Sequence, residues 1–314
     1  MIDGKKKIMP GRRALHAFIK ALYVFSERLG KATVYDIGKA RGLKYQRKIR
    51  YCDDRRPYLN LCYGEDAAAN GGKRPVLFYI HGGGFVSGRP EFREAFVSKF
   101  AAAGYFTVSV FYGLAPRYTH PAPIENVYNA LAWTAENAER FSLDLDRLFL
   151  CGDSAGAMLA ATAAAISSNA EYKELFRLNA ASRDCKCRGV ILNCGIYDVD
   201  KALQSGFPHI RYFIEANYGG DLASADKDSP NYAGMSPERF ITEAFPPTMV
   251  ITAERDKLTA GGRAFYDGLV EKGVHARLFH GKGSNAVHAF PVAQMFKISR
   301  EAADECVDFA DGLS

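Results

Sequence analysis

The stretch Gly152-Asp-Ser-Ala-Gly156 follows the apolar run 147–151 and precedes an alanine-rich segment with helical character. A serine with a glycine two residues away on each side, between a strand and a helix, has the sequence form of a nucleophile elbow. The glycines are needed because the turn strains the serine backbone while strand and helix pass too close for a Cβ. The stretch predicts an outward-facing Ser154 hydroxyl, and a purely structural glycine turn is the alternative interpretation.

A second glycine-rich loop, His81-Gly-Gly-Gly-Phe85, follows the apolar run 75–80. Such a loop can turn backbone N–H groups toward a site, where fixed donors stabilise the negative charge of an acyl-transfer transition state. Gly82 is expected to shape the bend. Three amides are expected to be the donors, namely those of Gly83, Gly84 and Ala155. A phosphate cradle has weaker support because no Gly-Lys-Ser/Thr or complete GxGxxG pattern follows.

A serine nucleophile needs a base, and the base needs an orienting acid. Four histidines follow the serine: His209, His275, His280 and His288. His288 is preferred because it lies in a loop rich in Gly, Ser and Asn beyond the last strand-like segment, from which it can reach the carboxyl edge of a sheet. His280, nearer the end of that segment, is the competitor.

Carboxylates that follow predicted strands are the candidates for the acid. Asp256 is preferred because it lies just past the buried strand predicted at 247–252, where it can meet a histidine from the next loop. Glu254 is the second candidate for the acid, and its alternative role is to support Arg255. Asp198 is weaker because it comes one strand too early.

These residues carry a family resemblance. The chain contains, in the family's order, the motifs His81-Gly-Gly-Gly-Phe85, Tyr112-Gly-Leu-Ala-Pro116, Pro121-Ala122, Trp133, Gly152-Asp-Ser-Ala-Gly156, Asp256-Lys-Leu258 and His288-Ala-Phe290. It resembles the hormone-sensitive-lipase-like branch of the α/β-hydrolases, the family IV esterases with an HGGG loop, over roughly residues 45–310. The resemblance implies Ser154 as nucleophile, Asp256 as acid and His288 as base.

The same resemblance covers the surroundings of these three residues. It implies that the Gly83, Gly84 and Ala155 amides form an oxyanion hole, and we expect Phe85 and Tyr112 among the binding residues. The chain departs from the family where a charged residue is usual, at Phe111, Gly113, Arg117 and Asn126, and Ala157 replaces a usual glycine. In the family these charged positions look like an ion network behind the site.

The layout predicts one α/β domain over residues 1–314. Short apolar runs, typical of buried parallel strands, lie at 75–80, 106–112, 147–151, 189–194, 247–252 and 276–279. Helical patterns alternate with them at about 91–103, 123–140, 154–170, 260–272 and 291–311. This alternation predicts the α/β-hydrolase fold, with a mostly parallel, doubly wound sheet. The segments 47–53 and 58–63 are expected to form a leading antiparallel hairpin.

Two segments do not fit the alternation, about 1–40 and 197–245. The family analogy makes them a helical cap over the site. The second carries aromatic residues that could wall an acyl or alcohol pocket: Phe207, Tyr212, Phe213, Tyr218 and Tyr232. An ordinary surface excursion with its own small core is the alternative.

The charge and cysteine content restrict the classes of partner. The net charge of +6 comes from 41 basic and 35 acidic residues, and no nucleic-acid recognition motif appears. The apolar stripe at 14–25 is too short to span a membrane and lacks a cleavage site, so no stable membrane association is expected. The seven scattered cysteines lack zinc spacing. We therefore expect a cytoplasmic protein with reduced thiols and neither metal nor cofactor; a homodimer is compatible with the sequence.

The hypothesis from sequence is a serine carboxylesterase that cleaves short-chain, uncharged acyl esters, its small-molecule substrates, through an acyl-enzyme intermediate. Two alternatives remain open. One is a non-catalytic small-molecule receptor or scaffold on the same fold. The other is an amidase or lipase that uses the same three residues.

Overall fold

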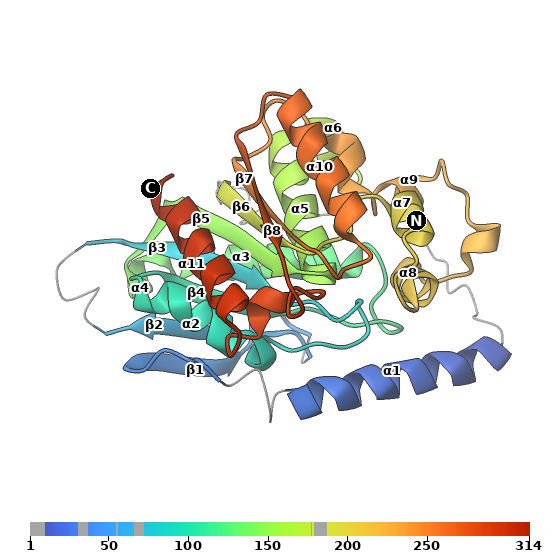
Figure 1. The fold of residues 1–314 in the computed structure, drawn as a ribbon. Helices are drawn as coiled ribbons and strands as arrows, with labels where there is room; N and C mark the ends of the chain where they lie inside the picture. The colour runs from blue at the N-terminus through green and yellow to red at the C-terminus, as the bar shows by residue number, and fades with distance from the viewer. Residues whose placement is uncertain (1–9, 31–36, 55, 66–71, 177, 179–186) are drawn as a thin grey trace.

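The computed structural model describes residues 10–30, 37–54, 56–65, 72–176, 178 and 187–314. Its centre is an eight-stranded sheet in the order β1-β2-β4-β3-β5-β6-β7-β8 (Figure 1). The strands are β1 Leu43–Ile49, β2 Tyr58–Gly64, β3 Arg74–Ile80, β4 Phe106–Phe111, β5 Leu143–Asp153, β6 Cys187–Asn193, β7 Thr248–Ala253 and β8 Ala276–Gly281. Strands β3 to β8 are parallel, and the β1–β2 and β2–β4 pairs are antiparallel. All six predicted apolar strands are confirmed.

The predicted hairpin is present, but its first strand was placed too late in the chain. Strand β1 ends at Ile49, and its pairing with β2 shifts register between Gln46 and Ile49. Lys48 adopts a φ of +59° inside this irregularity, and its amide donates to the Asn60 side chain at 2.8 Å. Pairing resumes after this bulge only at Ile49, so residues 50–53 of the predicted strand belong to the connection between β1 and β2.

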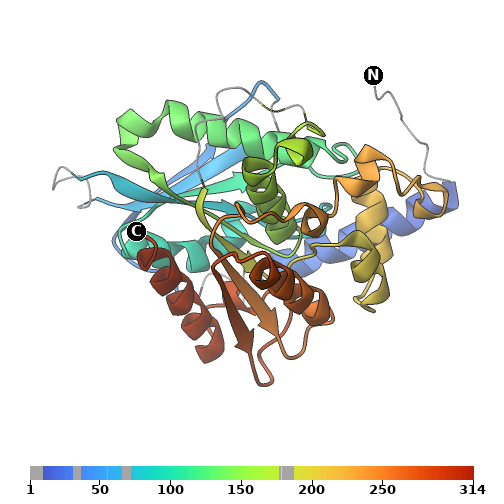
Figure 2. The same ribbon diagram turned by 90° about the horizontal axis from the view of Figure 1, so that it is seen from above.

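Helices cover both faces of the sheet (Figure 2). One face carries α2 Glu94–Ala102 and α11 Lys297–Asp311, and the other carries α3 Ala122–Glu136, α5 Ala155–Ser168 and α10 Thr259–Glu271. Successive residues of β3 enter opposite layers: Val76 and Phe78 join the core under α3 and α5, and Leu77 joins the core under α2 and α11. A strand buried on both faces must be apolar throughout, as the sequence pattern indicated.

The predicted helices are confirmed with shifted or broken ends. The helix predicted at 123–140 divides into α3 and α4 Ala138–Phe141. The segment 154–170 forms α5 and α6 Ala170–Lys173, and 91–103 begins as the 3-10 turn η3 Pro90–Arg93 before α2. The last helix, predicted from residue 291, begins at Lys297 after the 3-10 turn η7 Phe290–Val292.

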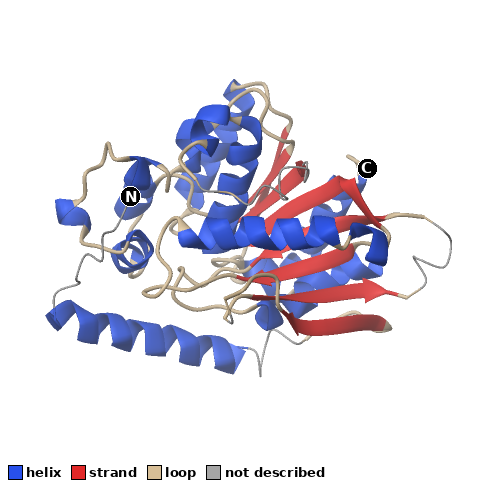
Figure 3. Cartoon of the chain, turned by 180° about the vertical axis from the view of Figure 1, so that it is seen from behind, coloured by secondary structure: helices blue, strands red, loops and turns tan. Residues whose placement is uncertain are grey.

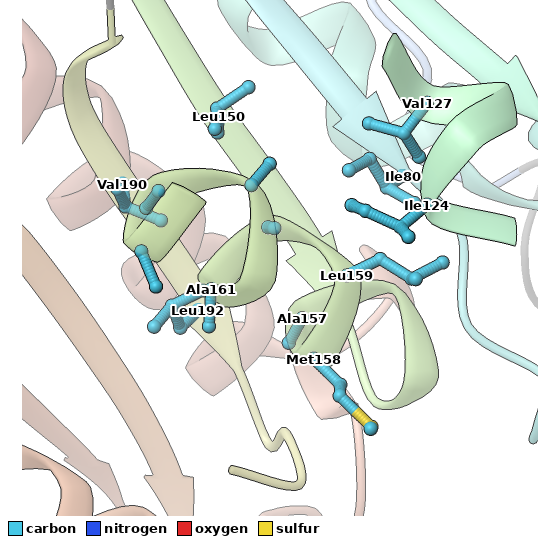
Figure 4. Packing of buried hydrophobic residues seen from close by; sticks show 14 of the residues in the cluster. Ile80, Ile124, Val127, Leu150, Ala157, Met158, Leu159, Ala161, Val190 and Leu192 are labelled. Carbon is cyan, nitrogen blue, oxygen red and sulfur yellow. The ribbon is translucent and has the colours of Figure 1, made fainter. Parts of the chain in front are cut away.

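Helix α5 packs tightly on the centre of the sheet (Figure 4). Its small residues Ala157 and Ala161 lie over Leu192 of β6, while Leu159 points toward Ile80 and Ile124. All three of the helix residues named are at most 4% exposed. The alanine-rich composition therefore lets the helix axis approach the strands and fixes the position of the residue before its first turn.

Helices from the two remaining segments lie at one end of the sheet (Figures 1 and 3). Helix α1 spans Pro10–Gly30, and the second segment contains α7 Val199–Gln204, α8 Ile210–Tyr218, η5 Leu222–Ser224, α9 Pro230–Ala233 and η6 Pro237–Phe240. Ile19 of α1 packs in one cluster with Tyr212, Phe213 and Ala216 of α8. No helix in the described ranges has both the length and the apolar character that crossing a membrane requires.

Substitution of Gly156 tests the close approach of α5 to the sheet. A Cβ on Gly156 would lie 2.0 Å from the Ile80 carbonyl oxygen, so Gly156→Ala is expected to lower the free energy of unfolding by at least about 1–3 kcal/mol. In the control Gly261→Ala, the new methyl meets nothing within 4 Å on a helix, and a gain of about 0.5–1 kcal/mol is expected. Denaturant unfolding measures both, and equal effects would contradict the packing argument.

Candidate active site

Ser154 sits in a strained turn between β5 and α5. Its φ of +54° and ψ of −118° are rare for a residue with a side chain. A Cβ on Gly152 would lie 2.4 Å from the carbonyl carbon of Gly156, so the flanking glycines are a steric requirement. The turn therefore has the strand–turn–helix form that the glycine spacing predicted.

Three side chains from three separate loops form a hydrogen-bonded chain. His288 Nε2 lies 2.9 Å from Ser154 Oγ, and His288 Nδ1 lies 2.9 Å from Asp256 Oδ2. Ser154 follows β5, Asp256 follows β7 and His288 follows β8. The Asp256 side chain is 1% exposed and that of His288 26%, and Ser154 is half-buried, so the serine and histidine meet solvent and the carboxylate does not. The structure brings together the three residues that the sequence singled out.

Asp256 is held in its ionised form. Burial pushes the pKa of Asp256 upward, but the hydrogen bond and charge of His288, with further donors in the Leu258 amide and the Cys194 thiol, hold it below its ordinary value. An ionised Asp256 accepts a hydrogen bond from the protonated Nδ1 of His288. The neutral imidazole then has its lone pair on Nε2, where it accepts the hydrogen bond from Ser154 Oγ.

The competing candidates lie in other contacts. His280 is part of β8, with its Nδ1 2.9 Å from Thr252 Oγ1. Glu254 accepts the Gly283 amide at 2.6 Å rather than supporting Arg255, and Asp198 accepts the Lys201 amide at the start of α7. None of these three candidates contacts the serine.

The glycine-rich loop after β3 lies beside the elbow because β3 and β5 are neighbours in register. Ile80 pairs with Gly152, so both chains leave the sheet at the same level. Gly84 has a φ of +60°, and a Cβ there would lie 2.3 Å from the Phe213 ring. In the part of the chain that the structure describes, the backbone amides of Gly83, Gly84 and Ala155 donate to no protein acceptor, and neither do those of Phe85 and Gly156 in the same two loops. Such amides are available to an oxyanion.

A buried carboxylate joins the two loops. Asp153, 1% exposed, accepts hydrogen bonds from the Gly82 amide at 3.0 Å and from Tyr79 Oη at 2.7 Å. Arg93 binds both of its oxygens, with Nε and Nη2 at 3.0 and 2.9 Å. Burial pushes the pKa of Asp153 up, but the charge and hydrogen bonds of Arg93 hold it below the ordinary value. Sequence reasoning missed this pair, although an acidic residue at the end of an apolar strand is a signal for the Asp153 half.

Phe85 and Tyr112 lie against the glycine-rich loop. Phe85 is 1% exposed, and its carbonyl accepts the Ala115 amide at 2.8 Å. The Tyr112 hydroxyl donates to the His81 carbonyl at 3.0 Å, and the two rings stack with centroids 4.5 Å apart. Both residues therefore support the loop, and their role in binding stays a prediction.

Neutral contacts occupy the positions where the family usually has charges. Asn126 Oδ1 accepts the Gly113 amide at 2.8 Å, and a Cβ on Gly113 would lie 2.3 Å from the Tyr118 ring. Phe111 stacks on Tyr58 with ring centroids 4.8 Å apart. At these positions a hydrogen bond and aromatic packing replace the ion pairs that the resemblance led us to expect.

Comparison with known proteins gives the family. A profile of the α/β-hydrolase fold matches residues 77–292. The chain is 30% identical over 248 residues to Esterase LipQ of Mycobacterium tuberculosis (strain ATCC 25618 / H37Rv). This match covers 77% of the chain and 56% of the relative, so the chain spans little more than half the length of that curated protein.

Solved structures agree on the fold. Esterase B from Lactobacillus rhamnosis (HN001) superimposes with a TM-score of 0.82 at 23% identity, over 97% of this chain and 96% of that one. The same enzyme inhibited by a C4-C4 tributyrin phosphonate gives a TM-score of 0.81 at 23% identity, over 98% and 96% of the two chains. These findings confirm the predicted fold, and with the family profile they confirm the resemblance to hormone-sensitive-lipase-like hydrolases.

Removal of Arg93 is expected to be costly because it leaves a buried carboxylate without its counter-charge. Arg93→Met should lower the free energy of unfolding by about 3–5 kcal/mol, measured by denaturant titration. The control Arg277→Met breaks the exposed ion pair with Glu305 and should cost less than about 1 kcal/mol. A loss as small in Arg93→Met as in the control would show that the buried pair does not hold the loops.

His81 makes stability depend on pH. Burial lowers its pKa to about 4, and its Nδ1 contacts the Gly82 carbonyl at 2.6 Å. Between about pH 6.5 and 4, His81 is protonated in the unfolded chain and neutral in the folded protein. As the pH is lowered through this range, the free energy of unfolding therefore decreases by up to about 1.4 kcal/mol per pH unit. The free energy of unfolding of His81→Asn, measured by denaturant titration across this pH range, should change less steeply with pH than that of the wild type. Parallel curves throughout would contradict the assignment.

Proposed function

The chain belongs to the α/β-hydrolase fold family, and from this we propose that it is a serine carboxylesterase that cleaves short-chain, uncharged acyl esters. The observation that carries the proposal is the hydrogen-bonded chain from Asp256 through His288 to Ser154, next to backbone amides with no protein acceptor. A nucleophile, a base held in the useful tautomer and free oxyanion donors are the parts that acyl transfer needs.

In the proposed reaction, Ser154 Oγ attacks the ester carbonyl while His288 Nε2 takes the hydroxyl proton. The amides of Gly83, Gly84 and Ala155 stabilise the oxyanion. Collapse of the tetrahedral intermediate breaks the bond to the alcohol, which leaves with the proton from His288, and an acyl-enzyme remains. Water, deprotonated by His288, then attacks the acyl carbonyl. The bond from the acyl carbon to Ser154 Oγ breaks as His288 returns the proton to that oxygen, and the acid is released. Asp256 stabilises the imidazolium formed at each step.

Aromatic side chains support the proposed preference for short acyl groups. The Phe207 ring lies edge-on to His288 with centroids 4.7 Å apart, and Phe213 fills the space over Gly84. We propose that segments 1–40 and 197–245 form a cap over the site, because α1 packs on α8 and α8 reaches the glycine-rich loop; residues 1–9 and 31–36 of the first segment lie outside the described residues. Rings this close to the base and to the glycine-rich loop limit the space for a long chain. The likeness to an esterase inhibited by a tributyrin phosphonate agrees with this size.

Turnover of p-nitrophenyl butyrate tests the proposal. Ser154→Ala and His288→Ala should each lower kcat/KM by at least about 10³-fold, because the members of the triad act as a unit. The matched control is His280→Ala, which removes the competing histidine of β8 and should retain the wild-type rate. Equal rates for wild type and Ser154→Ala would remove the proposal.

A series of p-nitrophenyl esters from acetate to laurate tests the size preference. The highest kcat/KM is expected at acetate or butyrate. Phe207→Ala should move the optimum toward longer chains, because it removes a ring next to the base. A wild-type optimum at laurate would contradict the short-chain part while leaving the serine mechanism intact.

A further inference from the structure

Cys194 lies behind the proposed catalytic residues and has no part in ester cleavage. It follows β6 with a φ of +49° and is 3% exposed, and its amide donates to the Ile251 carbonyl at 2.9 Å. Its sulfur lies within 4.8 Å of a carboxylate oxygen of Asp256. A thiol with an ordinary pKa of about 8.5 is mostly protonated at neutral pH.

The thiol, the carboxylate and the imidazole form a compact set of metal ligands. One ligand atom each from Cys194, Asp256 and His288 lies within 4.8 Å of the other two. Sulfur, carboxylate oxygen and imidazole nitrogen bind Zn²⁺ at about 2.0–2.3 Å, which sets tetrahedral ligands roughly 3.3–3.7 Å apart. The distances to sulfur therefore need to shorten by up to about 1.5 Å, while the 2.9 Å contact between His288 Nδ1 and Asp256 Oδ2 opens by a few tenths of an ångström.

We propose that Cys194, Asp256 and His288 form an inhibitory site for a thiophilic divalent cation such as Zn²⁺. Binding releases one proton to solvent, from the thiol, while the proton of Nδ1 moves through solvent to Nε2, and the metal forms bonds to sulfur, Nδ1 and a carboxylate oxygen. Thiolate and carboxylate together neutralise the double positive charge, which a largely buried site requires. Water takes the fourth tetrahedral position. Mg²⁺ is excluded because it prefers six oxygen ligands.

Inhibition follows from the tautomer of His288. With Nδ1 bound to the metal, the neutral imidazole carries its proton on Nε2. That atom lies 2.9 Å from Ser154 Oγ and would donate to the hydroxyl instead of accepting its proton. The base is lost although the imidazole stays in place. Because only His288 of the three is partly exposed, the ion enters from its side, and slow onset of inhibition is expected.

The effect on activity rests on the proposed function, whereas metal binding does not, so binding is measured first. Co²⁺ added to wild type, Ser154→Ala and Cys52→Ser should give a thiolate-to-cobalt charge-transfer absorption of one equivalent. Cys52 is the matched control because it is more exposed and lies in the β1–β2 connection. Cys194→Ser and Cys194→Ala should lack the absorption. Its absence from wild type, or its persistence in folded Cys194 variants, would overturn the site.

Ester turnover after incubation with Zn²⁺ then tests inhibition. Loss of even an outer-shell partner weakens metal affinity about 10–100-fold, so Cys194→Ser should raise the half-inhibiting zinc concentration at least that much, each variant compared with its own metal-free rate. Cys52→Ser should match wild type, chelation should restore the rate, and Mg²⁺ should have no effect. Equal zinc sensitivity of Cys194→Ser and wild type would overturn the inhibitory role. A wild type without esterase activity would count against the proposed function, and the cobalt absorption would still decide the site.

Discussion

The buried carboxylate of Asp153 determines where the two glycine-rich loops lie relative to each other. Register between β3 and β5 brings the loops to the same level, but a loop of glycines has no conformational preference that would keep it there. The hydrogen bond from the Gly82 amide to Asp153 attaches the first loop to the residue before Ser154. Arg93 makes this carboxylate tolerable in an apolar interior by occupying both of its oxygens.

Two buried carboxylates near the elbow differ in their partners, and the partners set their roles. Asp153 is paired with a guanidinium that never loses its charge, so its hydrogen bonds are permanent and structural. Asp256 is paired with His288, whose charge changes during the proposed reaction. The same residue type therefore anchors a loop in one place and responds to proton transfer in the other.

Features that local sterics dictate could be predicted from the sequence. Gly152 and Gly156 indicate the elbow because any side chain there would collide with backbone. The apolar runs indicate strands that are buried on both faces of the sheet. Asp256 and His288 could be found because loops after parallel strands share one edge of the sheet. Arg93 could not, because a single arginine on a surface-like helical pattern does not reveal the carboxylate it reaches across the core. The end of β1 and the contact of Cys194 with Asp256 depend in the same way on long-range geometry.

The neutral contacts behind the site show which supports the loop needs. The Gly113 backbone N–H donates to the Asn126 side chain, at two positions where the family usually has charges. The loop after β3 nevertheless remains attached at two other points. Tyr112 holds the His81 carbonyl and Asp153 holds the Gly82 amide, one on each side of a single peptide unit. Because these two bonds fix the peptide that precedes the free amides, an outer ion network adds stability without setting the direction of the donors. Its loss is therefore compatible with the proposed oxyanion site, whereas loss of Asp153 would release the Gly82 amide from the residue before Ser154.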